Sequence, residues 1–136
     1  MVVLTNSRIS GTITLLITIF SSSLPAYSKY SDGTGEPNDP YQIATATDLM
    51  LLGETPEDYD KHFILTADID LDPNLPGGKV FDTAVIAPDL SARQAHFQGI
   101  YFTGVFDGNG RVIRHLRVRG AGYLGLIGCI GTGVIT

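Results

Sequence analysis

The sequence predicts a mainly β fold in which short strands and tight corners follow one another as the rungs of a solenoid. The chain of 136 residues holds 16 glycines, 7 prolines and no tryptophan, which is typical of a turn-rich folded domain. From residue 63 to 72, apolar and polar side chains alternate. Residues 102–118 predict a strand, a bend and a second short strand, because Ile113 and Leu116 break strict alternation near Arg114 and His115.

The first 28 residues predict a cleavable secretory signal. Arg8 gives a positive start, residues 13–20 form an apolar run, and Pro25 precedes small residues suited to cleavage near Ser28. The apolar run is too short for a spanning helix, which needs about twenty residues. We therefore expect a secreted or cell-surface protein with no membrane span after cleavage. An uncleaved anchor or a buried strand is the alternative.

Residues 29–40 are rich in Ser, Asp, Gly and Pro, which predicts an ordered loop or a flexible linker. The packed module is expected over residues 41–136. Thr45, with Asp48 three residues on, predicts the start of a short helix that presents residues 49–52 as its apolar face and ends at Gly53.

A second helical turn is expected after this helix. Thr55 is placed to cap it, and Pro56 suits its first position. Residues 73–101 then read as a long loop with one short strand around residues 80–86. A loop of this length is usual as an excursion from a repeating core.

Three aspartates, Asp68, Asp70 and Asp72, are expected to share the outer face of the strand over residues 63–72. Carboxylates are ligands for calcium, so these residues are the candidate metal ligands. The calcium loop of EF-hands does not fit, because its sixth and twelfth positions would hold Pro73 and Lys79. A solvated face or ion pairs across strands is the preferred interpretation, and no cofactor is expected.

No catalytic or cofactor-binding constellation stands out in the sequence. Cys129 lies in an apolar, glycine-rich stretch without a recognisable signature, and His62, His96 and His115 are scattered. The net charge of -5 disfavours binding to nucleic acid. With one cysteine, the chain has no internal disulfide.

The segment Asp107-Gly108-Asn109-Gly110 predicts a tight corner. Asn-Gly favours a type I′ turn, so a hairpin at 107–110 in a small antiparallel β domain is the alternative fold. The later stretch repeats the pattern of short apolar pairs and small turn residues. Its expected inward side chains are Leu124, Leu126, Ile127, Ile130, Val134 and Ile135.

These segments together resemble the amino-terminal part of bacterial secreted and surface proteins with GLUG-type repeats. The resemblance rests on Gly35, "DPYQI", "DLMLL", "LTADIDL", "FTGVFDGNGRVIRHL" and, at 125–128, "GLIG". It implies a right-handed parallel β-helix capped by the short helix, with adhesive or structural roles. The repeat-motif residues are Asp107, Gly108, Asn109, Gly110, Gly125, Leu126, Ile127 and Gly128.

The chain stops in mid-pattern at Thr136, whereas proteins of this kind continue with further repeats. An uncovered terminal rung exposes backbone groups and apolar side chains. We expect a fragment of a longer protein, or self-association through the open end.

The charge pattern predicts one register. If residues 69–72 stack in parallel beside residues 116–119, Asp70 neighbours Arg117 and opposite charges meet. Alternatively, the arginines of this region form a basic strip for an anionic glycan: Arg111, Arg114, Arg117 and Arg119.

We therefore expect a non-catalytic exported solenoid module, adhesive or structural, with surface glycans or proteins as partners. Two alternatives remain: a fragment of a carbohydrate-active β-helix enzyme, which needs a pair of carboxylates about 5–9.5 Å apart, and a nonfunctional fragment of a longer surface protein.

Overall fold

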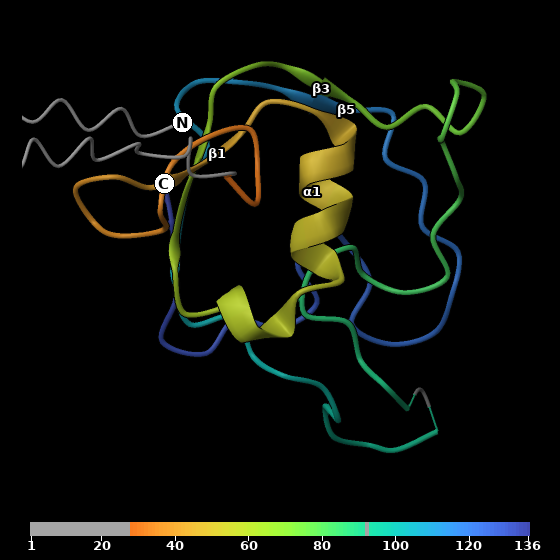
Figure 1. Ribbon diagram of the computed structural model, residues 1–136. Helices are drawn as coiled ribbons and strands as arrows, with labels where there is room; N and C mark the ends of the chain where they lie inside the picture. The colour runs from red at the N-terminus through yellow and green to blue at the C-terminus, as the bar shows by residue number, and fades with distance from the viewer. Residues whose placement is uncertain (1–27, 92) are drawn as a thin grey trace, which may run out of the picture.

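The computed structural model describes residues 28–91 and 93–136, whose regular elements are mainly short parallel strands with one short α-helix (Figure 1). This confirms the predicted fold class at the level of a mainly β chain. The expected signal sequence lies outside the described residues, apart from Ser28. The elements are β1 (Tyr41–Ile43), α1 (Ala46–Gly53), the 3-10 turn η1 (Pro56–Asp58), β2 (His62–Leu65), β3 (Ile69–Asp70), β4 (Val105–Asp107), β5 (Ile113–Arg114) and β6 (Val134–Ile135).

All strand pairs in the two sheets are parallel. One sheet has the order β1-β2-β4-β6, and β3 pairs with β5 in the other. In the larger sheet, Phe63 pairs with Tyr41 on one side and with Phe106 on the other. The alternative of an antiparallel hairpin at 107–110 is therefore wrong. β4 pairs with β2 and β6, and β5, the strand that follows the corner, pairs with β3 and not with β4.

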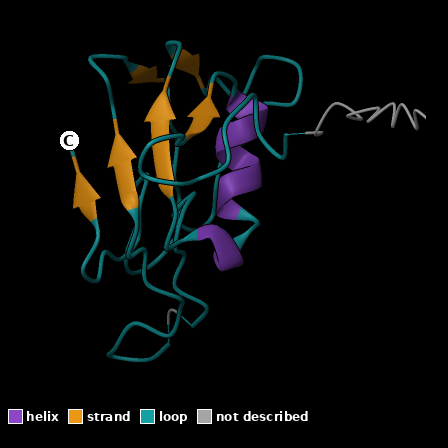
Figure 2. Cartoon of the chain, turned by 60° about the vertical axis from the view of Figure 1, so that its left-hand side comes forward, coloured by secondary structure: helices purple, strands orange, loops and turns teal. Residues whose placement is uncertain are grey.

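Three isolated parallel bridges continue this pairing outside the sheets. Phe81 pairs with Val118, Ile86 with Ile127, and Phe102 with Ile130. The strand expected around residues 80–86 is thus present only as two single bridges. Each later circuit of the chain lies beside the earlier one, and Figure 2 shows the strands of the larger sheet side by side.

Helix α1 covers the end of the stack next to β1, while the C-terminus lies at the other end, beyond β6 (Figure 2). Helix α1 starts where the sequence predicts. The Thr45 side chain accepts a hydrogen bond from the Asp48 N–H, and the Asp48 carboxylate accepts one from the Thr45 N–H. Leu49 and Leu52 are fully buried. The helix therefore closes the apolar interior at this end of the stack.

The second helical turn is only partly as predicted. Pro56 opens the 3-10 turn η1, but Thr55 makes no capping hydrogen bond there. Its hydroxyl instead donates to the Leu51 carbonyl oxygen at 2.7 Å. Thr55 therefore closes the end of α1 rather than the start of η1.

The core consists of aliphatic and aromatic side chains that stack from one circuit to the next. The ring of Phe63 lies 5.6 Å from that of Tyr41 and 6.1 Å from that of Phe102, measured between centroids. Phe63, Leu65, Ile69 and Leu71 are buried, as the alternation predicts. Ala67 is only half-buried.

The region expected as one strand over residues 63–72 is two strands. The chain turns at residues 66–68, so β2 belongs to one sheet and β3 to the other. The alternation continues through this corner because side chains on both sides of it still point inward. A period of two predicts burial correctly but does not locate a bend.

Residues 29–40 are packed against β1 and are not a free linker. Tyr30 is buried, and its ring centroid lies 4.7 Å from that of Tyr41. The Gln42 N–H donates to the Asp32 carbonyl oxygen at 2.8 Å, so this segment covers the outer edge of β1. Of the two alternatives, the ordered loop fits the structure, because the segment contributes an aromatic side chain to the core.

The last circuit is packed less tightly than the sequence predicts. Leu126 and Ile127 lie against the core. The other expected inward residues are exposed: Leu124, Ile130, Val134 and Ile135. In the described part of the chain, no further circuit lies over this face.

Candidate functional site

The segment 107–110 forms the corner between β4 and β5. Asn109 and Gly110 both have positive φ angles, of 47° and 63°, as a type I′ turn requires. The Arg111 N–H closes the turn by donating to the Gly108 carbonyl oxygen at 2.8 Å. The Asp107 carboxylate accepts from the Asn109 N–H at 2.7 Å. The turn type predicted from Asn-Gly is confirmed, although it joins strands of different sheets.

Asn109 also ties this corner to the preceding circuit. Its side-chain amide donates to the Leu65 carbonyl oxygen at 3.0 Å, across 44 residues of sequence. Leu65 is the last residue of β2, where the earlier circuit turns. The two corners are therefore stacked and joined by a side chain.

Replacing Asn109 with alanine should lower the free energy of unfolding by about 1–2 kcal/mol. The variant loses the bond to Leu65 and forces alanine into a left-handed conformation. Asn109→Gly loses only the side-chain bond, so it should cost less, about 1 kcal/mol. Denaturant unfolding of both variants checks this; equal values for the two would show that the conformational cost is absent.

The "GLIG" segment lies in the parallel pairing with the previous circuit. The Ile86 N–H donates to the Leu126 carbonyl oxygen at 2.9 Å, and the Gly128 N–H donates back to the Ile86 carbonyl oxygen at 2.9 Å. A Cβ on Gly128 would lie 2.4 Å from the Ala87 carbonyl oxygen, so this position has no room for a side chain. Gly125 has a φ of 148°, which favours glycine.

The three candidate metal ligands are each engaged with other parts of the protein. Asp68 accepts from the Val112 N–H and pairs with Arg114 at 3.1 Å. Asp70 accepts from the Asp72 N–H, and Asp72 accepts from the Asn74 N–H, each at 3.0 Å. Within the described ranges, no three histidine, cysteine or acidic side chains converge as metal ligands would.

The predicted contact between Asp70 and Arg117 is wrong, although the charge pattern behind it is partly right. Asp70 pairs in register with Arg114, three residues earlier, because Ile69 stands beside Ile113. Arg117 lies beyond the bend, where its carbonyl oxygen accepts from the Phe81 N–H. The bend predicted near Arg114 and His115 is present, because His115 has a left-handed backbone conformation with a φ of 58°.

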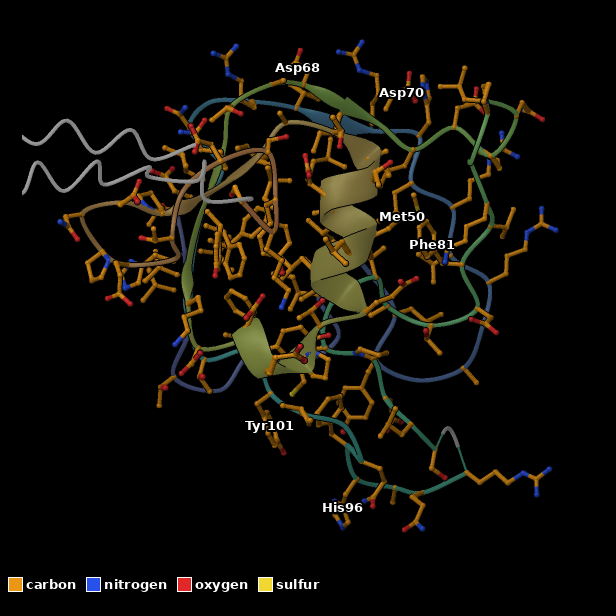
Figure 3. The ribbon with its side chains drawn as sticks, in the orientation of Figure 1. Met50, Asp68, Asp70, Phe81, His96 and Tyr101 are labelled. Carbon is orange, nitrogen blue, oxygen red and sulfur yellow. The ribbon has the colours of Figure 1, made fainter. Side chains whose placement is uncertain are left out.

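Asp70 and His115 form the outer end of this ladder. His115 Nδ1 lies 2.8 Å from Asp70 Oδ1, and both side chains are substantially exposed. The hydrogen bond with His115 is the main reason that the pKa of Asp70 lies below its ordinary value, and the Asp72 N–H lowers it further. Figure 3 shows Asp68 and Asp70 on the outer rim of the molecule.

The lowered pKa of Asp70 gives a defined pH dependence. Ionised Asp70 stabilises the fold at pH values above its ordinary pKa of about 4, and this contribution is lost as the pH falls through the lower folded value. In His115→Asn, asparagine tolerates the positive φ of this position, but the hydrogen bond from the imidazole is lost. The pKa of Asp70 should therefore rise toward its ordinary value. NMR titration of the Asp70 carboxyl carbon measures it. His96→Asn, in a loop outside the ladder, should leave it unchanged.

The structure also forms a cavity that the sequence does not predict. It lies between α1 and the segment that follows β3, and has a volume of about 300 Å³. Met50 and Phe81 face each other there in Figure 3, and Asp70, Asp72 and Lys79 supply its polar groups. These residues are far apart in sequence, so no local motif marks them.

The candidate catalytic side chains are not brought together. Cys129 is half-buried, and its carbonyl oxygen accepts from the Phe102 N–H. His62 belongs to β2, His115 faces Asp70, and His96 lies on the loop at the bottom of Figure 3. Among the described residues, no hydrogen bond joins the Cys129 thiol to any of these three histidines.

The comparisons with known proteins give one partial match. No family model matches the chain, and no solved structure matches it. Over 105 residues, 74% of this chain, it is 34% identical to halomucin of Haloquadratum walsbyi. The chain spans about 1% of the length of that protein. The name is not that of an enzyme, which agrees with the prediction of a non-catalytic chain. In the described residues, no helix has the length and apolar character to cross a membrane.

Proposed function

We propose that this chain is a non-catalytic module of an exported, cell-surface or extracellular protein, with an adhesive or structural role. We further propose that its circuits are the first coils of a right-handed parallel β-helix of the GLUG-repeat kind. The observation that carries the proposal is the parallel pairing of β1, β2, β4 and β6. The two repeat segments, 107–110 and 125–128, each contact the preceding circuit.

The aspartates support a structural rather than a catalytic role. A glycosidase needs one carboxyl group with a raised pKa, which can donate a proton near neutral pH. The pKa of Asp70 is lowered instead, and Asp68 is paired with Arg114. Opposite charges on neighbouring circuits stabilise the register, each pair by roughly 0.2–1 kcal/mol.

Export is supported by the signal-like start of the sequence and by the similarity to halomucin. The test is to express the full chain with a C-terminal tag in a bacterial host, beside a version that lacks residues 1–28. The full chain should be recovered outside the cytoplasm and be shorter by about the length of the signal. The version without residues 1–28 should stay in the cytoplasm. Retention of both would contradict the proposal.

Self-association through the last circuit is a further part of the proposal. β6 pairs with β4 on one side, and Val134 and Ile135 are exposed. An edge strand with exposed aliphatic side chains favours pairing with a second chain. Light scattering of the exported chain should therefore show dimers or larger species, and Ile135→Lys should shift it toward the monomer. Leu75→Lys, at an exposed residue on the loop after β3, should not.

A further inference from the structure

Three aromatic rings gather where the loop that precedes β4 meets the segment after β5; we refer to Phe97 and Tyr101, from the loop, and Tyr123, from the later segment, as the aromatic platform. The ring centroid of Phe97 lies 4.8 Å from that of Tyr101 and 5.2 Å from that of Tyr123. Tyr101 is 47% exposed and Tyr123 is 39% exposed. The loop projects from the stacked circuits at the bottom of Figures 1 and 3.

The base of this loop is fixed. The Asp89 carboxylate is 7% exposed and accepts from the Gln98 N–H at 2.8 Å and from the Ser91 N–H at 3.4 Å. The backbone at Gly99 lies so close to the other side of the loop that a Cβ would be 2.1 Å from the Pro88 carbonyl oxygen. Phe97 and Tyr101 therefore stand on either side of a closed loop base and do not depend on the outer part of the loop.

Tyr123 occupies a backbone conformation that is costly for its side chain. Its φ is 46°, in the left-handed region, where a bulky residue is an outlier. Such a conformation costs about 1–3 kcal/mol, and residues that keep it concentrate at functional sites. Glycine would adopt it without this cost, as neighbouring Gly122 does with a φ of 72°. The tyrosine at this position places its ring against Phe97 in spite of that cost.

We propose that the aromatic platform binds neutral pyranose sugars of a glycan. The faces of aromatic rings are electron-rich and attract the weakly positive C–H groups on one side of a pyranose ring. Tyrosine adds a hydroxyl group and loses little conformational entropy on binding. The inference rests on the proposed adhesive role and names the ligand class for it.

Other occupants fit the platform less well. Three rings offer far less than the roughly 800 Å² per partner of a stable protein interface. A chain with a net charge of -5 is repelled by anionic membranes and by sulfated glycans. Within the basic strip, Arg114 is already paired with Asp68. Neutral sugars need no opposite charge.

The test uses the full chain, exported and purified, on a printed array of neutral hexose and N-acetylhexosamine oligosaccharides, with heparin as the anionic probe. Since the chain has no tryptophan, its fluorescence comes from its tyrosines, two of which belong to the platform, and the change on titration is compared with that of Tyr101→Phe. At least one neutral oligosaccharide should bind. Tyr101→Ala and Tyr123→Gly should each weaken it about tenfold, which corresponds to about 1.4 kcal/mol. Tyr123→Gly removes the ring without adding backbone strain.

Matched variants separate binding from folding. Tyr101→Phe keeps the ring and should stay within about threefold of the parent affinity, about 0.7 kcal/mol. Leu75→Ala, at an exposed residue on a different loop, should leave the affinity unchanged. Circular dichroism spectra of all variants should match that of the parent.

Two results would overturn the inference. One is the absence of binding to every neutral oligosaccharide; the other is binding that persists in both Tyr101→Ala and Tyr123→Gly. Binding to heparin alone, lost in Arg117→Ala, would assign the glycan site to the basic strip and would leave the adhesive role intact. Failure of export, in contrast, would count against the proposed function whatever the array shows.

Discussion

Replacing Phe102 with alanine is expected to lower the free energy of unfolding by about 3–5 kcal/mol. Phe102 is fully buried and lies between circuits: its ring centroid is 6.1 Å from that of Tyr59 and 6.1 Å from that of Phe63. Its backbone meets the next circuit through hydrogen bonds with Cys129 and Gly131. Removing the ring leaves a cavity that borders two circuits.

The size of this cavity effect can be checked by chemical denaturation with two companion variants. Phe102→Leu retains much of the volume and should cost less than alanine. Ile100→Ala, two residues away but exposed, should change stability by no more than about 0.5 kcal/mol. A loss below about 1 kcal/mol for Phe102→Ala would mean that the circuits do not share a packed core.

Local patterns predicted those parts of the fold that depend on neighbours in sequence. The helix start at Thr45 and Asp48, the turn at Asn109-Gly110 and the inward side of residues 63–71 are all as expected. Each is set by interactions within about five residues. A helix cap, a turn that needs positive φ angles and an alternation of apolar and polar side chains can therefore be predicted from one sequence.

Features set by the stacking of circuits could not be predicted in this way. The register of β3 and β5 was misjudged by three residues, because Ile113 and Leu116 are both apolar and lie on either side of the bend at His115, so either could stand beside Ile69. The corner at residues 66–68 was missed because it leaves the inward and outward pattern intact. Tyr30 was assigned to a linker because its neighbours are turn residues, yet its ring packs on β1.

The candidate site was predicted less completely than the fold. The aspartates were correctly placed on an outer face, but their partners Arg114 and His115 come from a later circuit. The aromatic platform was missed, although Phe97 and Tyr101 are unusual in a stretch that otherwise reads as a loop. Two aromatic residues in such a loop are the feature of the sequence that could have indicated the platform. The contribution of Tyr123 depends on the folded path of the chain.

Tyr59 is the residue whose single hydroxyl group is expected to matter most. It is buried at the point where three segments meet. Its hydroxyl donates to the Gly53 carbonyl oxygen at 2.9 Å and accepts from the Ala87 N–H at 3.0 Å. Its own carbonyl oxygen accepts from the Gly104 N–H at 2.7 Å. The end of α1, the segment at Ala87 and the start of β4 are thus joined through one side chain and its backbone.

Tyr59→Phe keeps the ring and removes the hydroxyl group, leaving the buried Ala87 N–H without its partner. A buried unpaired group costs about 1–3 kcal/mol, so we expect a loss of about 2 kcal/mol. Burial also raises the pKa of Tyr59, so the folded state keeps this proton more tightly than the unfolded chain does. Stability therefore falls as the pH rises above the ordinary tyrosine pKa of about 10, and Tyr59→Phe should reduce that fall. Tyr101→Phe, at an exposed hydroxyl group, is the matched control in both measurements. Equal stability of the parent and Tyr59→Phe at neutral pH would show that this hydroxyl group does not join the three segments.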